Sequence, residues 1–178
     1  CMAGCSQEVV VQALKDLGLW PSGKENRPQI DLPRGVPVKW YADRNIWHWT
    51  YRYAQGGVAG HVVRYEGQDK KQVIPFFKVQ DQAWKPGAAP PPRPLYGVDK
   101  LSKSTTNPPV LICEGERACD AAQRLTGQSF VCITWPGGSK AVGKADWTPL
   151  KGRDVIVWPD ADHAGHQAAQ EVAWQCQQ

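Results

Sequence analysis

The stretch that decides the fold begins with Val110-Leu-Ile-Cys-Glu-Gly-Glu116 and ends with Val155-Ile-Val-Trp-Pro-Asp-Ala-Asp162. Each passage is a short, continuous apolar run followed at once by acidic residues, and a third apolar run occupies residues 130–133. Helical patterns follow the three runs, at residues 117–125, 140–150 and 163–175. Continuous apolar strands that alternate with helices are typical of a parallel sheet covered on both faces. The sequence therefore predicts an α/β fold for its carboxyl-terminal part.

A small antiparallel β region is predicted upstream. Residues 46–53 read Ile-Trp-His-Trp-Thr-Tyr-Arg-Tyr, a Gln-Gly-Gly turn follows, and further strand patterns cover residues 58–65 and 72–79. The passage 86–94 holds five prolines and is expected to be extended. We therefore expect three parts: a helix and linker at 1–33, a basic, aromatic-rich antiparallel β subdomain with its proline-rich linker at 34–94, and the parallel-sheet domain with flanking helices at 95–178.

Positive charge is concentrated in the middle of the chain. Residues 34–103 hold 12 basic and 5 acidic side chains, although the whole chain carries a formal charge of only +4. Strand alternation places Trp47, Trp49 and Tyr51 on one face, which we expect to be core. The opposite face and the loops are expected to track a nucleic-acid backbone. The basic residues proposed for this contact are Arg44, Arg52, Arg64, Lys70, Lys71 and Lys78.

Composition excludes some classes of protein. No run of about 18 apolar residues is present, so a membrane-spanning helix is not expected. Three of the six cysteines lie in or beside apolar segments, which favours reduced thiols and a cytoplasmic location over a disulfide framework. Cys1 and Cys5 are interpreted either as loose terminal thiols or as part of a zinc site.

Acidic side chains follow two of the three apolar runs. Glu114 follows the first run, Asp160 and Asp162 follow the last, and the glycine turn Gly137-Gly138 follows the middle one. Because ligands bind beyond the carboxyl ends of parallel strands, we expect these residues to converge. Three converging carboxylates repel one another unless a cation lies between them, and hard oxygen ligands suit Mg²⁺ or Mn²⁺.

Other interpretations of the same acidic residues stay open. Asp160 and Asp162 also fit the N-cap of the helix that follows, and with Gly165 they approach an EF-hand loop, although a strand pattern rather than a helix precedes them. Glu116 either supports a metal or is an ordinary acid in the first turn of a helix. Asp120 is expected to be structural or at the surface.

Basic and histidine side chains near these motifs are also ambiguous. Lys140 and Lys144 lie one helical turn apart beside the glycine turn, where they either hold phosphate or lie on a solvated face. His163 is expected to be a surface histidine rather than a ligand.

These motifs resemble the Toprim domain of primases, topoisomerases and some nucleases. The resemblance covers residues 110–172, and the passages 93–100 and 113–121 are most similar to primases of phages and mobile elements. Two departures stand out. Ala118 occupies a position where many primases have Asp, and the chain stops at Gln178, where a Toprim sheet normally gains a further strand. We interpret the chain as a C-terminally truncated fragment.

The resemblance implies the catalytic core of a DNA primase. Such a nucleotidyltransferase makes RNA primers from NTPs on a single-stranded DNA template, needs Mg²⁺ or Mn²⁺, and works with a fused or separate replicative helicase. It implies that Glu114 is the general acid/base, that Asp160 and Asp162 hold the metal with Glu114, and that the glycine turn lies beside the phosphates. The alternatives are a Toprim nuclease or topoisomerase, and a non-catalytic nucleic-acid-binding module.

Overall fold

The computed structural model describes residues 7–17, 45–66, 71–77 and 85–178. The chain divides into two compact units, Cys1–Leu32 and Pro33–Gln178, which are considered separately. In the first unit, α1 spans Gln7–Asp16, with Glu8 in its first turn and Lys15 in its last, as suits the helix dipole. The helix predicted at the amino terminus is therefore confirmed. No described helix is long and apolar enough to cross a membrane.

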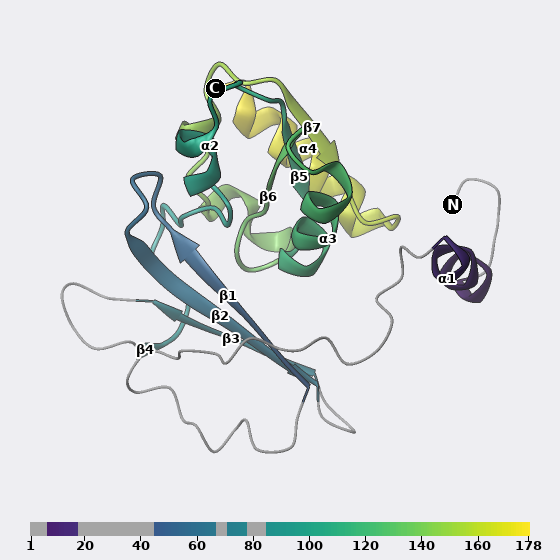
Figure 1. Ribbon diagram of the computed structural model, residues 1–178. Coiled ribbons are helices and arrows are strands. Elements are labelled where there is room, and N and C mark those ends of the chain that lie inside the picture. Colours follow the sequence, from purple (N-terminus) through teal and green to yellow (C-terminus); the bar gives the residue numbers. More distant parts are fainter. Residues whose placement is uncertain (1–6, 18–44, 67–70, 78–84) are drawn as a thin grey trace. The chain divides into compact units, whose positions relative to one another are not determined.

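An antiparallel sheet forms the first layer of the second unit (Figure 1). Its four strands lie in the order β1-β2-β3-β4 and span Asn45–Arg52, Val58–Glu66, Lys71–Phe77 and Lys85–Pro86. The predicted turn between β1 and β2 is closed by paired backbone hydrogen bonds, from Tyr53 N–H to Gly57 and from Gly56 N–H to Tyr53. The antiparallel subdomain expected from the sequence is thereby confirmed.

The aromatic face of this sheet is core, as the alternation predicted. Trp49 and Tyr51 are buried and pack with Phe77 and with Ala89 of the proline-rich segment. Gly60 lies under the Phe77 ring, where a Cβ would meet the ring carbon Cδ1 at 2.2 Å, so only glycine fits there.

The opposite face of the sheet carries a stacked histidine pair, of which His61 is buried and His48 half-buried. His48 Nε2 and His61 Nδ1 lie 2.8 Å apart, and the two rings stack with centroids 4.9 Å apart. Burial lowers the pKa of both imidazoles, to about 4 for His61, where the neighbouring His48 and Arg52 add to the effect. The lowered pKa of each ring favours the neutral imidazole.

Acid should destabilise the protein through His61. Its folded-state pKa of about 4 lies below the ordinary value of 6.5, so the folded protein binds fewer protons than the unfolded chain between these pH values. The free energy of unfolding should fall by about 2 kcal/mol as pH drops from 6.5 to 4, and level off below. Urea unfolding across this range measures it. His61→Gln should flatten the dependence, whereas His166→Gln, an exposed control, should leave it unchanged; equal slopes in all three proteins contradict the assignment.

The parallel sheet confirms the predicted α/β fold. Strands β5 (Val110–Cys113), β6 (Val131–Ile133) and β7 (Val155–Trp158) are all parallel and lie in the order β6-β5-β7. One face packs with Cys119 and Ala122 of α3 (Glu116–Thr126), and the other with Ala168 and Val172 of α4 (His163–Cys176). Helices therefore cover both faces of the sheet except at the edge strand β7, where Ile156 and Trp158 are 50% and 59% exposed, so the expected coverage of both faces is incomplete there.

The described cysteines are free thiols. Cys113, Cys119 and Cys132 are buried and Cys176 is half-buried. Burial raises the pKa of all four, to about 12 for Cys113. Reduced thiols were expected here, whereas Cys1 and Cys5 lie outside the described residues.

The region 140–150 differs from the predicted helix. It forms two short 3₁₀ segments, Ser139–Lys144 and Thr148–Leu150. Pro149 has no N–H to donate, which interrupts a regular helix, and the Trp147 indole between the two segments donates to the Val142 carbonyl at 3.0 Å. The apolar spacing that predicted one helix thus arises from two tightened turns.

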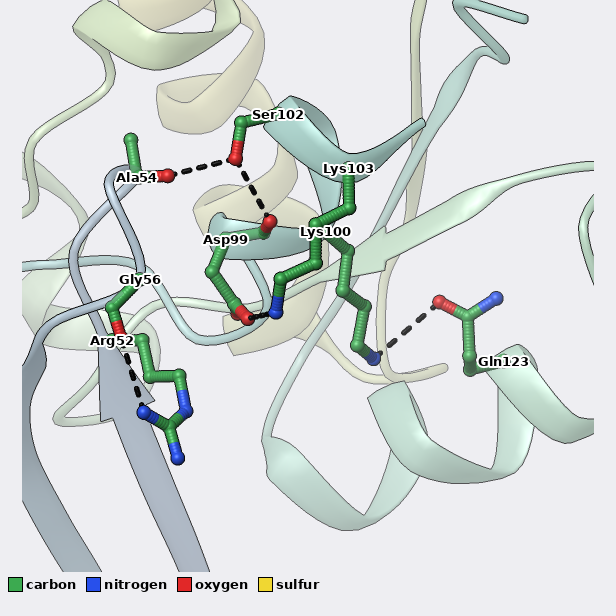
Figure 2. Close-up of polar contacts among 8 residues, drawn as sticks. All are labelled: Arg52, Ala54, Gly56, Asp99, Lys100, Ser102, Lys103 and Gln123. Carbon is green, nitrogen blue, oxygen red and sulfur yellow. Dashed lines mark hydrogen bonds and ion pairs between the residues drawn. The ribbon is translucent and has the colours of Figure 1, made fainter. Parts of the chain in front are cut away.

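A five-residue helix, α2 (Asp99–Lys103), joins the two sheets and was not predicted, because one turn has too little periodicity. Figure 2 shows its contacts in both directions. Ser102 Oγ donates to the Ala54 carbonyl in the β1–β2 turn at 2.8 Å, and Lys100 Nζ donates to Gln123 Oε1 of α3 at 3.5 Å. Hydrogen bonds therefore tie the antiparallel sheet to the helices that flank the parallel one.

Candidate metal and catalytic site

Glu114 lies directly after β5, on a turn that only glycine allows. Gly115 has φ 98° and ψ 155° and stands at the N-cap of α3, which has no side-chain cap. Its N–H donates to Oγ1 of the fully buried Thr134 at 2.9 Å. The turn that carries Glu114 is therefore held by a hydrogen bond to Thr134, the residue that follows β6.

Asp160 and Asp162 follow β7 and begin α4. Asp162 is the N-cap of α4, and its Oδ1 accepts a hydrogen bond from Gly165 N–H at 2.7 Å. A Cβ on Gly165 would lie only 2.5 Å from the carbonyl oxygen of Asp160. The spacing of the two aspartates and the glycine thus has a local structural role, and the N-cap interpretation is correct for Asp162.

The three carboxylates influence one another electrostatically. The pKa of Glu114 is raised, first by burial and then by the negative charges of Asp160 and Asp162, while a hydrogen bond from the Asp160 backbone acts in the opposite direction. The strand ends therefore bring these three acidic residues to one edge of the sheet, where the sequence predicted them.

Glu114 also carries an uncompensated oxygen. Its Oε2 is buried and has no hydrogen-bond partner in the structure, which is unusual for a buried polar atom. Asp160 and Asp162 are exposed, so the Asp160 side chain and the second carboxylate oxygen of the N-cap Asp162 are open to solvent and to a ligand. Among the described residues, no group of three or more His, Cys, Asp and Glu is already arranged to hold a metal ion. The donor set nevertheless fits a hard divalent cation, which would compensate the Glu114 oxygen.

Divalent cations should stabilise the chain through these residues. At a concentration 100-fold above its dissociation constant, one bound ion adds about 2.7 kcal/mol to the free energy of unfolding. Thermal melting with Mg²⁺ or Mn²⁺, against an EDTA baseline, measures the effect. Asp160→Asn with Asp162→Asn should raise the metal-free Tm by relieving repulsion, and should remove the metal response. Position 162 retains its capping oxygen in this variant. An equal metal-induced shift in both proteins argues against a metal site here.

The glycine turn after β6 lies beside an arginine that the sequence analysis did not select. Gly137 and Gly138 are exposed and have φ of 101° and 74°, and Trp135 Nε1 donates to the Gly138 carbonyl at 2.8 Å. A guanidinium nitrogen of Arg93 lies 3.1 Å from the place of a Cβ on Gly137. Arg93 lies in the passage 93–100, which resembles primases, and this resemblance is the signal that could have pointed to it.

The lysines near this turn are solvated. Lys140 and Lys144 are both exposed, and the 3₁₀ segment that carries them precedes a backbone pairing with the proline-rich segment. In that pairing Arg93 N–H donates to the Lys144 carbonyl, and Asp146 N–H donates to the Arg93 carbonyl. The phosphate-binding role of Lys140 and Lys144 stays a prediction.

Three of the six basic residues proposed for nucleic-acid contact, Arg52, Arg64 and Lys71, lie in the part of the chain that the structure describes. Arg44, Lys70 and Lys78 lie outside the described residues, and Lys71 is exposed. Arg52 donates to the Gly56 carbonyl at 3.0 Å (Figure 2).

The expected face of Arg64 is wrong. Arg64 pairs directly with Trp47 across β1 and β2, and directly paired residues share a face, so Arg64 lies on the aromatic side. Its guanidinium carbon is 5.8 Å from the Trp47 ring centroid, and that of Arg117 is 4.5 Å from it. The two guanidinium groups thus share one indole.

The loop after β7 is not an EF-hand, because a strand precedes it instead of a helix. His163 begins α4 and is exposed, as expected.

Comparison with known structures identifies the fold. The primase fragment of the bacteriophage T7 primase–helicase aligns with a TM-score of 0.52 at 19% identity, over 73% of this chain and 48% of that one. This chain has the fold of that primase fragment. The E. coli primase catalytic core aligns at 18% identity over 94% of this chain and 47% of the other, with a TM-score of 0.46. The chain thus spans about half the length of these solved chains. No protein-family model and no curated protein matches the sequence.

Within this primase fold, Glu116 and Asp120 contact the antiparallel sheet. Tyr51 OH donates to Glu116 Oε1 at 2.7 Å. Asp120 accepts two hydrogen bonds, from Trp49 Nε1 at 2.8 Å and from Tyr96 OH at 2.9 Å. Asp120 is therefore structural, as expected, and no local sequence pattern marks its partners, which come from distant segments.

Proposed function

We propose that this chain is part of the catalytic core of a DNA primase that makes RNA primers on single-stranded DNA in the replication of a phage or mobile element. The observation that carries the proposal is the unpartnered Oε2 of Glu114, in a carboxylate placed beside Asp160 and Asp162 at the sheet edge of a primase fold. A nucleotidyltransferase needs such a site to stabilise triphosphate charge and to move a proton.

Each acidic residue has a proposed role. Asp160 and Asp162 would hold Mg²⁺ or Mn²⁺ together with Glu114, and the bound ion would neutralise triphosphate charge and orient the nucleotide. Glu114 would accept the proton of the attacking 3′-hydroxyl. Its raised pKa makes the carboxylate a better proton acceptor than an ordinary glutamate.

The neighbouring basic residues suit the substrates of this reaction. Arg93 and the Gly137-Gly138 turn would contact nucleotide phosphates, with Lys140 and Lys144 nearby as solvated cations. The exposed Lys71 and the other basic residues of segment 34–103 would attract the single-stranded template. A replicative helicase, fused or separate, is the proposed partner, because the T7 structure comes from a primase–helicase.

Primer synthesis tests the proposal directly. The full-length protein is incubated with a single-stranded template, labelled NTPs and Mg²⁺, and products are separated on a denaturing gel. Short RNA products that require both template and metal are expected. Cleavage of the template without synthesis would instead assign the site to a nuclease, and binding with neither product would make the protein a non-catalytic module.

A further inference from the structure

The turn that carries Glu114 combines a glycine with a helix start that no side chain caps. Gly115 separates Glu114 from the first residue of α3, and a glycine at φ 98° is the most freely moving type of link in the backbone. No side chain caps the first turn of α3. The contacts that the structure gives this turn are therefore important for the direction of the Glu114 side chain.

Two of these contacts come from side chains of other elements. Thr134 accepts a hydrogen bond from the Gly115 N–H, and Tyr51 of β1 donates one to Glu116 Oε1. Both Thr134 and Tyr51 are completely buried, so neither can follow the turn if it moves. Hydrogen bonds to a carboxylate are short and strong, and the 2.7 Å distance to Glu116 fits one.

From this arrangement we infer that Tyr51 is a positioning residue for Glu114, acting through Glu116. Its hydroxyl holds the Glu116 side chain, and with it the first turn of α3, against the antiparallel sheet. The role of Glu116 is then to accept this hydrogen bond, rather than to hold a metal. The inference rests on the proposed function for its effect on turnover, but not for its effect on the Gly115 turn.

Asp120 provides a matched comparison on the same helix. It lies four residues after Glu116, on the same side of α3, and accepts a hydrogen bond from the hydroxyl of Tyr96. Tyr51→Phe and Tyr96→Phe therefore remove the same kind of tyrosine–carboxylate contact from α3. Only the Tyr51 contact lies beside Glu114, because Glu116 is two residues away from it in the chain.

Hydrogen exchange tests the positioning role in the full-length protein. Tyr51→Phe should speed amide exchange of Gly115 roughly 10-fold, the effect of losing one hydrogen bond to a charged group. Tyr96→Phe should leave Gly115 at the wild-type rate once any change in global stability is subtracted. Glu116→Gln keeps an oxygen that accepts the Tyr51 hydroxyl, so it should retain slow exchange at Gly115.

Turnover provides the second measurement. Tyr51→Phe should lower the kcat of primer synthesis about 10-fold with little change in the KM for template, whereas Tyr96→Phe should keep both. If wild-type protein makes no primer, the proposed function fails, and the exchange rates still decide the inference. Wild-type exchange at Gly115 in Tyr51→Phe, or equal acceleration by Tyr96→Phe, would overturn it.

Discussion

Glu114→Gln should reduce primer synthesis by a factor of about 10² to 10⁴, the usual contribution of a general acid or base. Glutamine has the size of glutamate, but it neither accepts a proton at neutral pH nor carries the charge that a metal ion would compensate. The substitution also removes a charge that Asp160 and Asp162 oppose, so the metal-free fold should be at least as stable as the wild type. Single-turnover primer synthesis and thermal melting measure the two effects.

Glu171→Gln is the control for this experiment. Glu171 is an exposed carboxylate two turns into α4, and its loss should leave turnover unchanged. If Glu114→Gln retains near wild-type synthesis, Glu114 is not the acid/base and the role implied by the resemblance fails. If Glu114→Gln instead unfolds the protein, its carboxylate has a structural role that the uncompensated Oε2 does not explain.

The positions of the three acidic residues could be predicted because they depend on local pattern. Each follows a strand that is marked by a continuous apolar run, and parallel strands bring their carboxyl ends to the same edge. The Gly137-Gly138 turn was found in the same way. The N-cap at Asp162 could also be predicted, because a cap and its helix are adjacent in sequence.

The contacts that hold the site could not be predicted. Tyr51 and Glu116 are 65 residues apart, and Trp49 and Asp120 are 71 apart, so no local pattern links them. Arg64 was placed on the wrong face because its side depends on the pairing of β1 with β2, which strand alternation within β2 alone does not determine. The 3₁₀ segments at 139–150 were missed because apolar spacing does not distinguish one helix from two short turns.

Gly165→Ala should destabilise the protein by about 2 kcal/mol and weaken any metal response at Asp160. The added Cβ would lie 2.5 Å from the carbonyl oxygen of Asp160, a distance that Cβ atoms do not tolerate, and 3.0 Å from its nitrogen, which is also tight. Both atoms are backbone, so the strain can be relieved only by moving the segment that carries Asp160 away from α4. The substitution therefore links the stability of the helix start to the geometry of the site.

Gly143→Ala shows whether the effect comes from backbone crowding. A Cβ at Gly143 would lie 2.9 Å from Oε1 of Glu171, a flexible, exposed side chain that can rotate away. This control should change the free energy of unfolding by less than about 0.5 kcal/mol, as surface substitutions usually do. Urea unfolding of both variants, repeated with and without Mn²⁺, separates the two cases. An equally small loss of unfolding free energy in the two variants would mean that the segment carrying Asp160 moves at little energetic cost. The glycine of this motif would then not be what holds the aspartates in place.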